Sequence, residues 1–535
     1  MTAPGGRRSV RCRTVRRARG VIGAVAIAVT IAACAGNGGP VAKSASQDSR
    51  APASVPVTDP DEPSAPPPTV GGTQPAPGAA GAVSDPDGIG DELLPPLGNP
   101  GLDVQHYDVD LTYDHADTTV RATVAIDLRL TEDREEITLD ADGPEIDAVR
   151  VDGVDATFTQ EDVELRIELP QPGRTGDDLR VEVDYHFTGN RLSNQTGLPV
   201  GWFNTAGGSY VLNEPDGART WLPSNDHPSD KATFTFTIHV GSGVTAVANG
   251  ELVSQSTTDD GGATWVWRQD EPMATYLVQL LTGDYELIDG ATPDGVPLTS
   301  AVLRSELPQM QPLVDDIDEE IAYFEQFFGP FPLDRYGIAI TDSSRGLAME
   351  TQGRSLFSRD DLSGDPRGSD HVVLSHELAH QWFGDAVSPA RWQDIWLNES
   401  FATYGEWMYG EHVGFRTVQD QADAALADRP PGVTADPTLS EMFGFDVYQG
   451  GAVALHALRL TIGDDAFFDL LRQWVARNDG TSRTTEDFIA LAEKVSGQDL
   501  TEFFDDWIFS AEVPRSFPTP APTPSSTPPL VTIGS

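Results

Sequence analysis

The feature that most constrains the fold is a change in the spacing of apolar residues partway along the chain. From residue 104 to about residue 288, apolar and polar residues alternate in short runs, such as residues 120–128, and Gly, Asp and Pro separate the runs. This alternation is typical of strands that bury one face. After Leu307 the apolar residues recur at helical spacing, beginning with Leu313 and Ile317. The sequence therefore predicts a multidomain α+β protein, with an antiparallel β-domain followed by a mainly helical domain that has a small sheet.

The N-terminal segment has the pattern of a secretory leader. The first 33 residues carry seven Arg and no acidic residue, and they end in an apolar run of 13 residues from Val21 to Ala33. That run is too short to span a membrane, and the small residues at its end are typical of a cleavage site. We therefore expect residues 1–33 to be a signal peptide.

The residues around the expected cleavage site resemble the lipobox of bacterial lipoproteins. The run Ile31-Ala32-Ala33-Cys34 places a cysteine directly after the leader, where the resemblance implies lipidation of Cys34. The implied location is extracytoplasmic, with the lipid as the only membrane contact; an ordinary signal peptide and a secreted protein are the alternative. The other cysteine, Cys12, lies in the leader, so no disulfide is expected in the mature chain.

Composition sets the remaining boundaries. Residues 34–98 are rich in Pro, Ala, Gly and Ser and are expected to form a disordered tether, and the Pro-rich residues 514–535 a disordered tail. Between them we expect a β-domain at 99–289 and a helical domain at 290–513. The net charge of −48 argues against binding of nucleic acid by bulk electrostatics.

The chemistry is indicated by the run His376-Glu377-Leu378-Ala379-His380. On a helix, residues four apart share a face, so His376 and His380 can bind one Zn²⁺. Glu377 lies beside that metal, as a general base acting on zinc-bound water requires. A catalytic zinc needs a third protein ligand and one open position, and Glu399 follows His380 after 18 residues. The expected cofactor is one zinc ion per chain.

The motifs HELAHQWFGD and WLNESFATY, with this gap between them, resemble those of the aminopeptidase N-type zinc metallopeptidases, a gluzincin family. Further similar segments lie at residues 211–226, 229–234, 248–250 and 273–277. The resemblance implies a saddle-like or sandwich-like β-domain followed by a thermolysin-like catalytic domain. It also implies hydrolysis of the N-terminal peptide bond of peptides that have a free N-terminus.

The resemblance further implies residues that face the substrate. Glu350 and Glu214 match the acidic residues that bind the α-ammonium group, which carboxylates recognise by charge-assisted hydrogen bonds. Ala348 and Met349 belong to the matching strand, which pairs with the substrate backbone. Tyr448 matches the tyrosine that donates a hydrogen bond to the tetrahedral oxyanion.

The chain also departs from the family pattern. Leu347 and Thr351 replace the Gly and Asn of the GxMEN motif, Gly450 stands where a Lys is usual, and Ser400 replaces a common Gly. The chain also ends soon after these motifs, as a short form without a C-terminal helical domain. We therefore expect a more open cleft and weaker selection for peptide length.

Three other functions remain open from the sequence. An endopeptidase or an epoxide hydrolase would use the same zinc scaffold. A zinc-stabilised surface lipoprotein without activity would need four protein ligands and no adjacent general base. The sequence does not indicate the preferred N-terminal residue, the physiological substrate or the oligomeric state.

Overall fold

The computed structural model describes residues 88–161, 163–342 and 348–519. The expected signal peptide and Cys34 lie outside these residues, as do most of the expected tether and tail. Among the described residues, no helix combines the length and apolar character needed to cross a bilayer.

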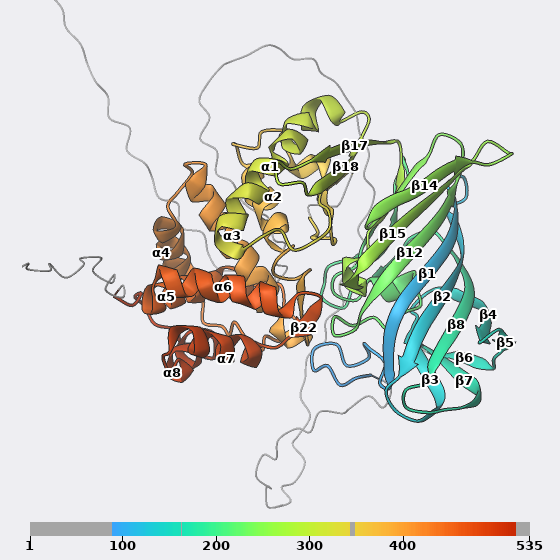
Figure 1. Cartoon of the computed structure of the whole chain (residues 1–535), viewed down its shortest axis with the longest axis horizontal. Coiled ribbons are helices and arrows are strands. Elements are labelled where there is room, and N and C mark those ends of the chain that lie inside the picture. Colours follow the sequence, from blue (N-terminus) through green and yellow to red (C-terminus); the bar gives the residue numbers. More distant parts are fainter. Residues whose placement is uncertain (1–87, 162, 343–347, 520–535) are drawn as a thin grey trace, which may run out of the picture. The chain divides into compact units, whose positions relative to one another are not determined.

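The first half of the described body is built from three β-sheets (Figure 1). The largest has eight strands in the order β14-β15-β12-β1-β2-β8-β4-β5. Its strands are β1 (Leu102–Asp114), β2 (Thr119–Leu130), β4 (Glu145–Val151), β5 (Val154–Asp155), β8 (Asp178–Thr188), β12 (Lys231–Val240), β14 (Glu251–Thr257) and β15 (Ala263–Ala274). Strand β12 has a strict alternation of buried and half-buried residues, as the sequence pattern predicts. Within this eight-stranded sheet, all neighbouring strands pair antiparallel except β1 and β12, which run parallel.

Two smaller sheets complete this domain. One has the order β13-β16-β11-β10-β9, and the other β3-β7-β6. Their strands are β9 (Arg191–Ser193), β10 (Val200–Asn204), β11 (Ser209–Leu212), β13 (Thr245–Ala248), β16 (Leu280–Gly283), β3 (Arg134–Asp140), β6 (Phe158–Glu161) and β7 (Glu164–Gly173). Fully buried Trp202 and Trp221 pack together in the core, with ring centroids 5.7 Å apart. Such large aromatic side chains bury enough apolar surface to fix neighbouring sheets.

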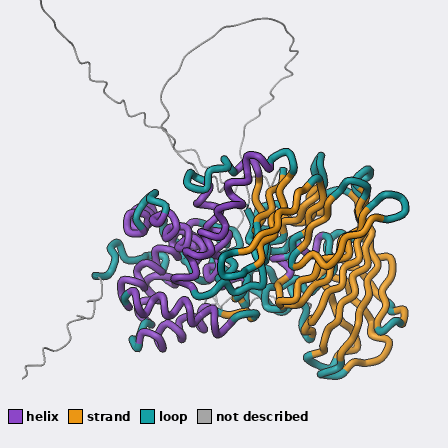
Figure 2. The backbone as a smooth tube through the Cα atoms, turned by 45° about the horizontal axis from the view of Figure 1, so that its top comes forward, coloured by secondary structure: helices purple, strands orange, loops and turns teal. Residues whose placement is uncertain are grey.

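The second half is mainly helical, and Figure 2 shows the helices gathered together. Its helices are α1 (Leu307–Phe328), α2 (Asp370–Ala379), α3 (Trp396–His412), α4 (Val418–Asp428), α5 (Gly451–Ile462), α6 (Asp464–Asn478), α7 (Thr485–Ser496) and α8 (Thr501–Phe504). A small mixed sheet has the order β17-β18-β19-β20. Its strands are β17 (Tyr285–Ala291), β18 (Pro297–Leu303), β19 (Ile338–Thr341) and β20 (Ser355–Ser358), while β21 (Val387–Pro389) pairs with β22 (Thr481–Arg483). An N-terminal β-rich domain followed by a helical domain is the order that the sequence predicts.

The expected domain boundaries differ from the structure in detail. Strand β17 begins within the part of the sequence assigned to the β-domain, but it pairs with β18 and so belongs to the sheet of the second domain. The end of the expected tether is packed: Leu94 and Leu97 are fully buried. Asp91 accepts a hydrogen bond from the backbone N–H of Trp392 at 2.8 Å and contacts the His227 ring at 3.2 Å. These few apolar and acidic residues order a segment whose overall composition predicts disorder.

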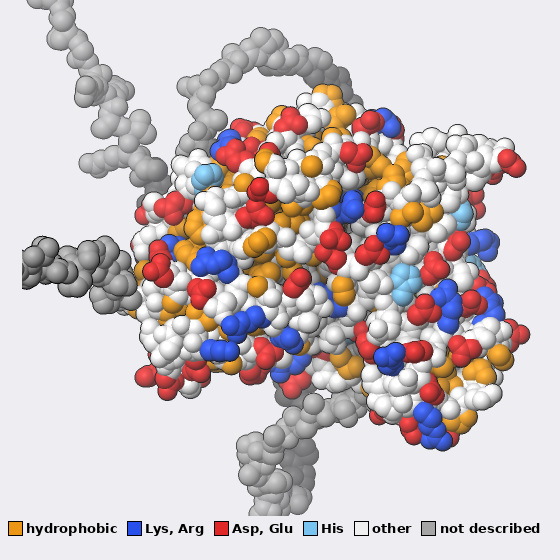
Figure 3. Space-filling view, viewed as in Figure 1, with side chains coloured by type: hydrophobic (Ala, Val, Ile, Leu, Met, Phe, Trp, Pro, Cys, Tyr) orange, Lys and Arg blue, Asp and Glu red, His pale blue; other side chains and the backbone are white. Residues whose placement is uncertain are grey.

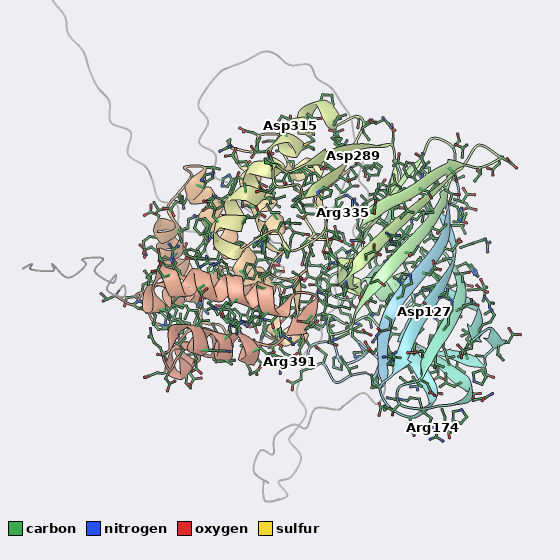
Figure 4. All side chains as sticks on the ribbon, viewed as in Figure 1. Asp127, Arg174, Asp289, Asp315, Arg335 and Arg391 are labelled. Carbon is green, nitrogen blue, oxygen red and sulfur yellow. The ribbon has the colours of Figure 1, made fainter. Side chains whose placement is uncertain are left out.

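Acidic and basic side chains are interspersed on the face shown in Figure 3. Many arginines pair with nearby carboxylates. Arg180 contacts Asp127 at 2.9 Å, and Arg174 contacts Asp133 at 2.8 Å; Asp127 and Arg174 are labelled in Figure 4. Exposed pairs of this kind contribute little to the stability of the protein. The stability of the fold therefore depends mainly on its apolar core.

Candidate active site

Two helices bring three potential metal ligands together. His376 lies on α2, His380 ends that helix, and Glu399 lies in the first turn of α3. The Glu399 Oε2 atom is 3.3 Å from His376 Nε2 and 3.5 Å from His380 Nε2. The three ligand atoms lie within 4.8 Å of one another. The helix thus presents the two imidazoles on one face, as their spacing of four residues predicts.

This geometry fits zinc. With zinc–ligand distances of about 2.0–2.1 Å, two ligand atoms of a tetrahedral site lie about 3.4 Å apart. The far side of each ring is also occupied: His380 Nδ1 lies 3.1 Å from the carbonyl oxygen of Phe383, and His376 Nδ1 lies 3.6 Å from Glu406 Oε2. A proton held on each Nδ1 leaves each Nε2 lone pair free for the metal. Two nitrogens and one carboxylate oxygen make a donor set typical of a catalytic zinc with one open position.

The pKa values of the two carboxylates at this centre, Glu399 and Glu377, are shifted in opposite directions. Burial alone would raise the pKa of Glu399, but the neighbouring His380 and His376 hold it at about 2, so Glu399 is ionised. Burial raises the pKa of Glu377, the residue after the first histidine, to about 8. Glu377 is buried, and its Oε2 atom has no hydrogen-bond partner among the described residues.

Two further carboxylates converge on the same place. Oxygen atoms of Glu214, Glu350 and Glu399 lie within 4.8 Å of one another, as do ligand atoms of Glu350, Glu377 and His380. Glu350 is buried, Glu214 is half-buried, and the Oε1 atom of each lacks a hydrogen-bond partner among the described residues. Burial and the neighbouring carboxylates raise the pKa of Glu214. This group of oxygen atoms can accept hydrogen bonds from a cation.

The segment that carries Glu350 is fixed by an isolated antiparallel bridge rather than by a strand of a sheet. Met349 exchanges both backbone hydrogen bonds with Leu356 of β20, at 2.9 and 2.7 Å. In an antiparallel pair, the backbone groups of the residues on either side point to the opposite edge. The Gln381 side chain donates to the carbonyl oxygen of Glu350 at 3.0 Å. Half-buried Ala348 precedes Met349 at this edge.

The β-domain holds the turn that follows Glu350. Asn249 donates to the carbonyl oxygen of Gln352 at 3.0 Å, and Gln279 donates to Thr351 Oγ1 at 2.8 Å. Asn249 belongs to one of the segments on which the family resemblance rests. The hydroxyl of Thr351 in turn donates to the carbonyl oxygen of Arg354. Thr351, which departs from the GxMEN pattern, is therefore integrated into the turn by its own hydrogen bonds.

Tyr448 lies on a wide, π-helical turn, Asp446–Gly450, directly before α5. Its ring stacks on that of His376, with centroids 5.9 Å apart and planes 9° apart. Burial, together with the carboxylates of Glu399 and Glu214, raises the pKa of the phenol, so the hydroxyl keeps its proton. The structure thus brings the expected catalytic, metal and substrate residues to one region. Cys34, the expected lipidation site, lies outside the described residues.

Some residues that support this site were not predicted from the sequence. Tyr276 donates to the carbonyl oxygen of Gly384 and accepts from Asn398, both at 3.1 Å, and Lys231 donates to the carbonyl oxygen of Asp385 at 2.6 Å. These contacts link the β-domain to the backbone that follows His380 and to the side chain that precedes Glu399. Lys231 and Tyr276 lie in two of the segments that carry the family resemblance, but no local pattern indicates their contacts. Glu406 is different, because it follows Glu399 by seven residues on α3, a spacing that predicts the same helical face.

The comparisons with known proteins agree with this arrangement. Residues 103–277 match the Peptidase M1 N-terminal domain, and residues 314–507 match the Peptidase family M1 domain. An M1 zinc metallopeptidase from Deinococcus radiodurans has a crystal structure similar to this one, with a TM-score of 0.74 and 33% sequence identity over 82% of this chain and 100% of that chain. A mutant form of that enzyme, bound to a Tyr-Ser-Ala substrate, gives a TM-score of 0.73 at 32% identity, with the same coverage.

Curated relatives are more distant and longer. "Probable aminopeptidase 2" of Sulfurisphaera tokodaii is 28% identical over 399 residues, which cover 70% of this chain and 49% of that protein. "Leucyl aminopeptidase" of Saccharolobus solfataricus is 26% identical over 413 residues, 71% of this chain and 50% of that protein. The chain thus spans about half the length of these relatives.

A β-rich domain, a helical domain and a site with two histidines and a glutamate define a two-domain zinc metallopeptidase. The two domain matches and the similarity to the whole Deinococcus structure, over 82% of this chain, make the assignment specific. The chain belongs to the M1 family of zinc peptidases, and its cofactor is zinc.

Proposed function

We propose that this protein is a zinc-dependent aminopeptidase of the aminopeptidase N type, which hydrolyses the first peptide bond of peptides with a free N-terminus. The observation that carries the proposal is the convergence of Glu214 and Glu350 beside the zinc site, with oxygen atoms that no described residue satisfies. A buried carboxylate without a donor is costly. A peptide α-ammonium group supplies three N–H donors and a positive charge, which satisfy both carboxylates at once.

His376, His380 and Glu399 would hold the zinc ion. When bound, zinc lowers the pKa of a coordinated water towards about 7 and polarises the carbonyl of the scissile bond. Glu399, whose pKa lies at about 2, contributes a negative charge at neutral pH. Glu406 and the Phe383 carbonyl hold the two rings in the orientation that the metal requires.

Glu377 is the general base in this proposal. Its carboxylate accepts the proton of the attacking water and then delivers it to the amine of the leaving peptide. Its buried position beside the ligands, without a competing hydrogen bond on Oε2 from any described residue, leaves it free for both transfers.

Tyr448 and the segment at Ala348 and Met349 complete the reaction geometry. The protonated phenol of Tyr448 donates a hydrogen bond to the oxygen that becomes negatively charged as the carbonyl is attacked. The backbone at Ala348 pairs with the substrate backbone, and the bridge between Met349 and Leu356 keeps this segment in place. Glu214 and Glu350 then set the register, so that only the first peptide bond reaches the metal.

The test compares pairs of peptides that differ only in acetylation of the N-terminus. We expect cleavage of the free peptide one residue from its N-terminus, loss of cleavage on chelation, recovery with added zinc, and no cleavage of the acetylated peptide. Internal cleavage of both peptides would instead establish an endopeptidase. Hydrolysis of an epoxide but of no peptide would establish the epoxide hydrolase, and no turnover at full zinc occupancy would leave a non-catalytic surface protein.

We also propose that the protein is a lipoprotein, anchored to the extracytoplasmic face of the cell membrane through Cys34. The support is the arginine-rich leader, the short apolar run and the small residues that precede Cys34. Labelled fatty acid should enter the wild-type protein and not the Cys34→Ser variant, and the variant should move from the membrane fraction to the soluble fraction. Equal labelling of both proteins contradicts the anchor, and release of unlabelled wild-type protein indicates secretion.

A further inference from the structure

The backbone around Tyr448 is held from outside by two side chains. The turn Asp446–Gly450 is π-helical, and π-helical turns are rare and concentrate at functional sites. A turn of this kind has a wider hydrogen-bond pattern than the α-helix that follows it. The position of the Tyr448 ring therefore depends on contacts that fix the turn on both sides of the residue.

Arg429 makes such contacts on both sides of Tyr448. Its Nε donates to Asp446 Oδ1 at 3.0 Å, two residues before Tyr448, and its Nη1 donates to the carbonyl oxygen of Gly450 at 3.2 Å, two residues after. Its Nη2 donates to Thr434 Oγ1 at 2.8 Å, and Thr434 itself donates to the carbonyl oxygen of Asp446 at 3.0 Å. The Arg429 side chain has no exposed surface. All three nitrogens of the guanidinium are thus used to hold this turn.

The space for the guanidinium exists because residue 450 is a glycine. A Cβ atom at Gly450 would lie 3.0 Å from both Cζ and Nε of Arg429, closer than ordinary van der Waals contact. The backbone of Gly450 is helical, with φ −63° and ψ −40°, so the turn itself does not require a glycine there. The guanidinium explains the missing side chain.

Ser400 provides the second contact. Its hydroxyl donates to the carbonyl oxygen of Val447 at 2.6 Å, directly before Tyr448. A Cβ atom at Gly451 would lie 1.7 Å from Ser400 Oγ, so the serine also fills the space left by a glycine. Ser400 follows Glu399 on α3, and the bond therefore joins the helix that carries this glutamate to the turn that carries Tyr448. Gly450 and Ser400 are two of the positions at which the chain departs from the family pattern.

We propose that Arg429 and Ser400 are positioning residues that hold the Tyr448 phenol where it stabilises the oxyanion. This inference rests on the proposed function of Tyr448. Arg429 acts through Tyr448, because its donors all contact the turn and its neighbour Thr434. Removing the guanidinium should therefore reduce kcat more than it changes KM.

The main experiment compares Arg429→Met with a matched control, Arg459→Met. Arg459 is also largely buried and pairs with Asp464 and the Tyr404 hydroxyl, which lie outside the turn. We expect Arg429→Met to lower kcat on aminoacyl-arylamides by about 10- to 100-fold, as a displacement of about 1 Å can, with KM changed less than about threefold. Arg459→Met should leave kcat within about twofold, and Arg429→Lys should recover part of the loss because it keeps the charge and one donor. Equal kcat for wild type and Arg429→Met would overturn the proposal.

A double variant shows whether Arg429 acts through Tyr448. If it does, Arg429→Met should add less than about threefold to the kcat loss caused by Tyr448→Phe, because effects of residues that act as a unit are not additive. If the kcat loss of the double variant instead equals the product of the two single losses, the proposal is overturned. If Tyr448→Phe alone keeps full kcat, Tyr448 does not have the proposed catalytic role. That result would contradict the proposed function itself, independently of whether Arg429 positions the ring.

Two further measurements do not depend on the Arg429→Met activity alone. Gly450→Ala places a methyl group against the guanidinium in helical backbone where alanine is normally favourable, and we expect it to lower kcat about two- to fivefold with an unchanged unfolding temperature. Hydrogen exchange of the peptide that covers residues 444–450 should become faster in Arg429→Met and in Ser400→Ala at unchanged zinc content. Unchanged exchange in both variants would show that neither side chain holds the turn.

Discussion

Two groups of buried carboxylates in this protein are stabilised in different ways. Asp140 and Asp226, in the β-domain, form the first group. Asp140 Oδ2 accepts from Asn99 Nδ2 at 2.6 Å and from the Asp226 backbone N–H at 2.8 Å, and Asp226 accepts from Thr275 at 2.6 Å. The second group consists of Glu214, Glu350 and Glu377 at the zinc site. Each of these glutamates has a buried oxygen atom that accepts no hydrogen bond from a described residue; Asp140 Oδ1 also accepts none, but Asp140 Oδ2 accepts the two bonds above.

In the proposed function, the difference separates carboxylates with a structural role from carboxylates that bind a ligand. Burial raises the pKa of carboxylates in both groups, for example to about 7 at Asp140 and to about 8 at Glu377, so the direction of the pKa shift does not distinguish them. The hydrogen-bond donors differ instead. The β-domain supplies N–H and O–H groups to Asp140 Oδ2 and to Asp226, whereas in the proposed function the site carboxylates pair with cations that are not part of the chain. In the proposed function these cations are the zinc ion and a peptide α-ammonium.

The largest expected effect is on Glu377. Glu377→Gln keeps the size of the side chain and removes the proton acceptor, and we expect kcat to fall by about 10³-fold or more while zinc content remains near one per chain. Arylamide hydrolysis and metal analysis of the same preparation measure both quantities.

Glu320→Gln is the matched control for this change. Glu320 on α1 is also buried, has an Oε1 atom without a partner among the described residues and has its pKa raised by burial, but it belongs to neither group. We expect its kcat to stay within about twofold of wild type. Full activity in Glu377→Gln would show that the proposed mechanism is wrong.

The next effect is on substrate recognition by Glu350. Glu350→Gln removes one of the two negative charges that face the α-ammonium, and we expect KM for substrates with a free N-terminus to rise by about 10- to 100-fold. Glu214→Gln should act in the same direction. Because an acetylated peptide has no ammonium group, neither variant should weaken its binding as a competitive inhibitor. An equal loss for free and acetylated ligands would contradict the assignment of these carboxylates.

A smaller effect is expected at Glu406, a carboxylate that faces the zinc-binding residue His376 rather than the substrate. Glu406→Gln weakens the contact with His376 Nδ1, and changes of this kind typically cost about 10-fold or more in metal affinity. Competition with a chromogenic chelator measures zinc affinity directly. An unchanged zinc affinity would mean that Glu406 does not orient the ring.

The zinc centre was more predictable from the sequence than its supports were. The spacing of His376 and His380 is a local property of one helix, and periodicity alone places both imidazoles on one face. Glu399 was proposed because a catalytic zinc needs a third protein ligand, and Tyr448 was inferred from the family resemblance, because no local pattern joins the turn before α5 to the histidines. Arg429 and Lys231 were not predicted, since each acts on backbone that is distant in the sequence.

In the fold, too, the sequence predicted local elements but not the contacts between distant segments. Alternation with a period of two predicted the strands of the β-domain, but it did not predict that β17 would pair within the second domain or that β1 and β12 would run parallel. Strand partners depend on contacts between distant segments rather than on the pattern within a strand. The expected tether extended too far for a related reason: Leu94 and Leu97 are too few to change the composition, yet they are fully buried against the body.

The smallest expected effect returns to the β-domain carboxylates and concerns pH. Burial, with the nearby Asp226 adding to it, raises the pKa of Asp140 from its ordinary value near 4 to about 7. Between these values Asp140 holds a proton in the folded protein that it has released in the unfolded chain, so the contribution of Asp140 to the stability of the wild type should fall as pH rises from about 4 to about 7 and then level off. Asp140→Asn mimics the protonated form and keeps an acceptor for Asn99. We expect the variant to unfold at the same temperature as wild type near pH 4.5 and a few degrees higher at pH 8, by thermal unfolding of zinc-loaded protein. A variant that is destabilised equally at both pH values would show instead that Asp140 is ionised in the folded state, and that its hydrogen-bond donors satisfy a full negative charge.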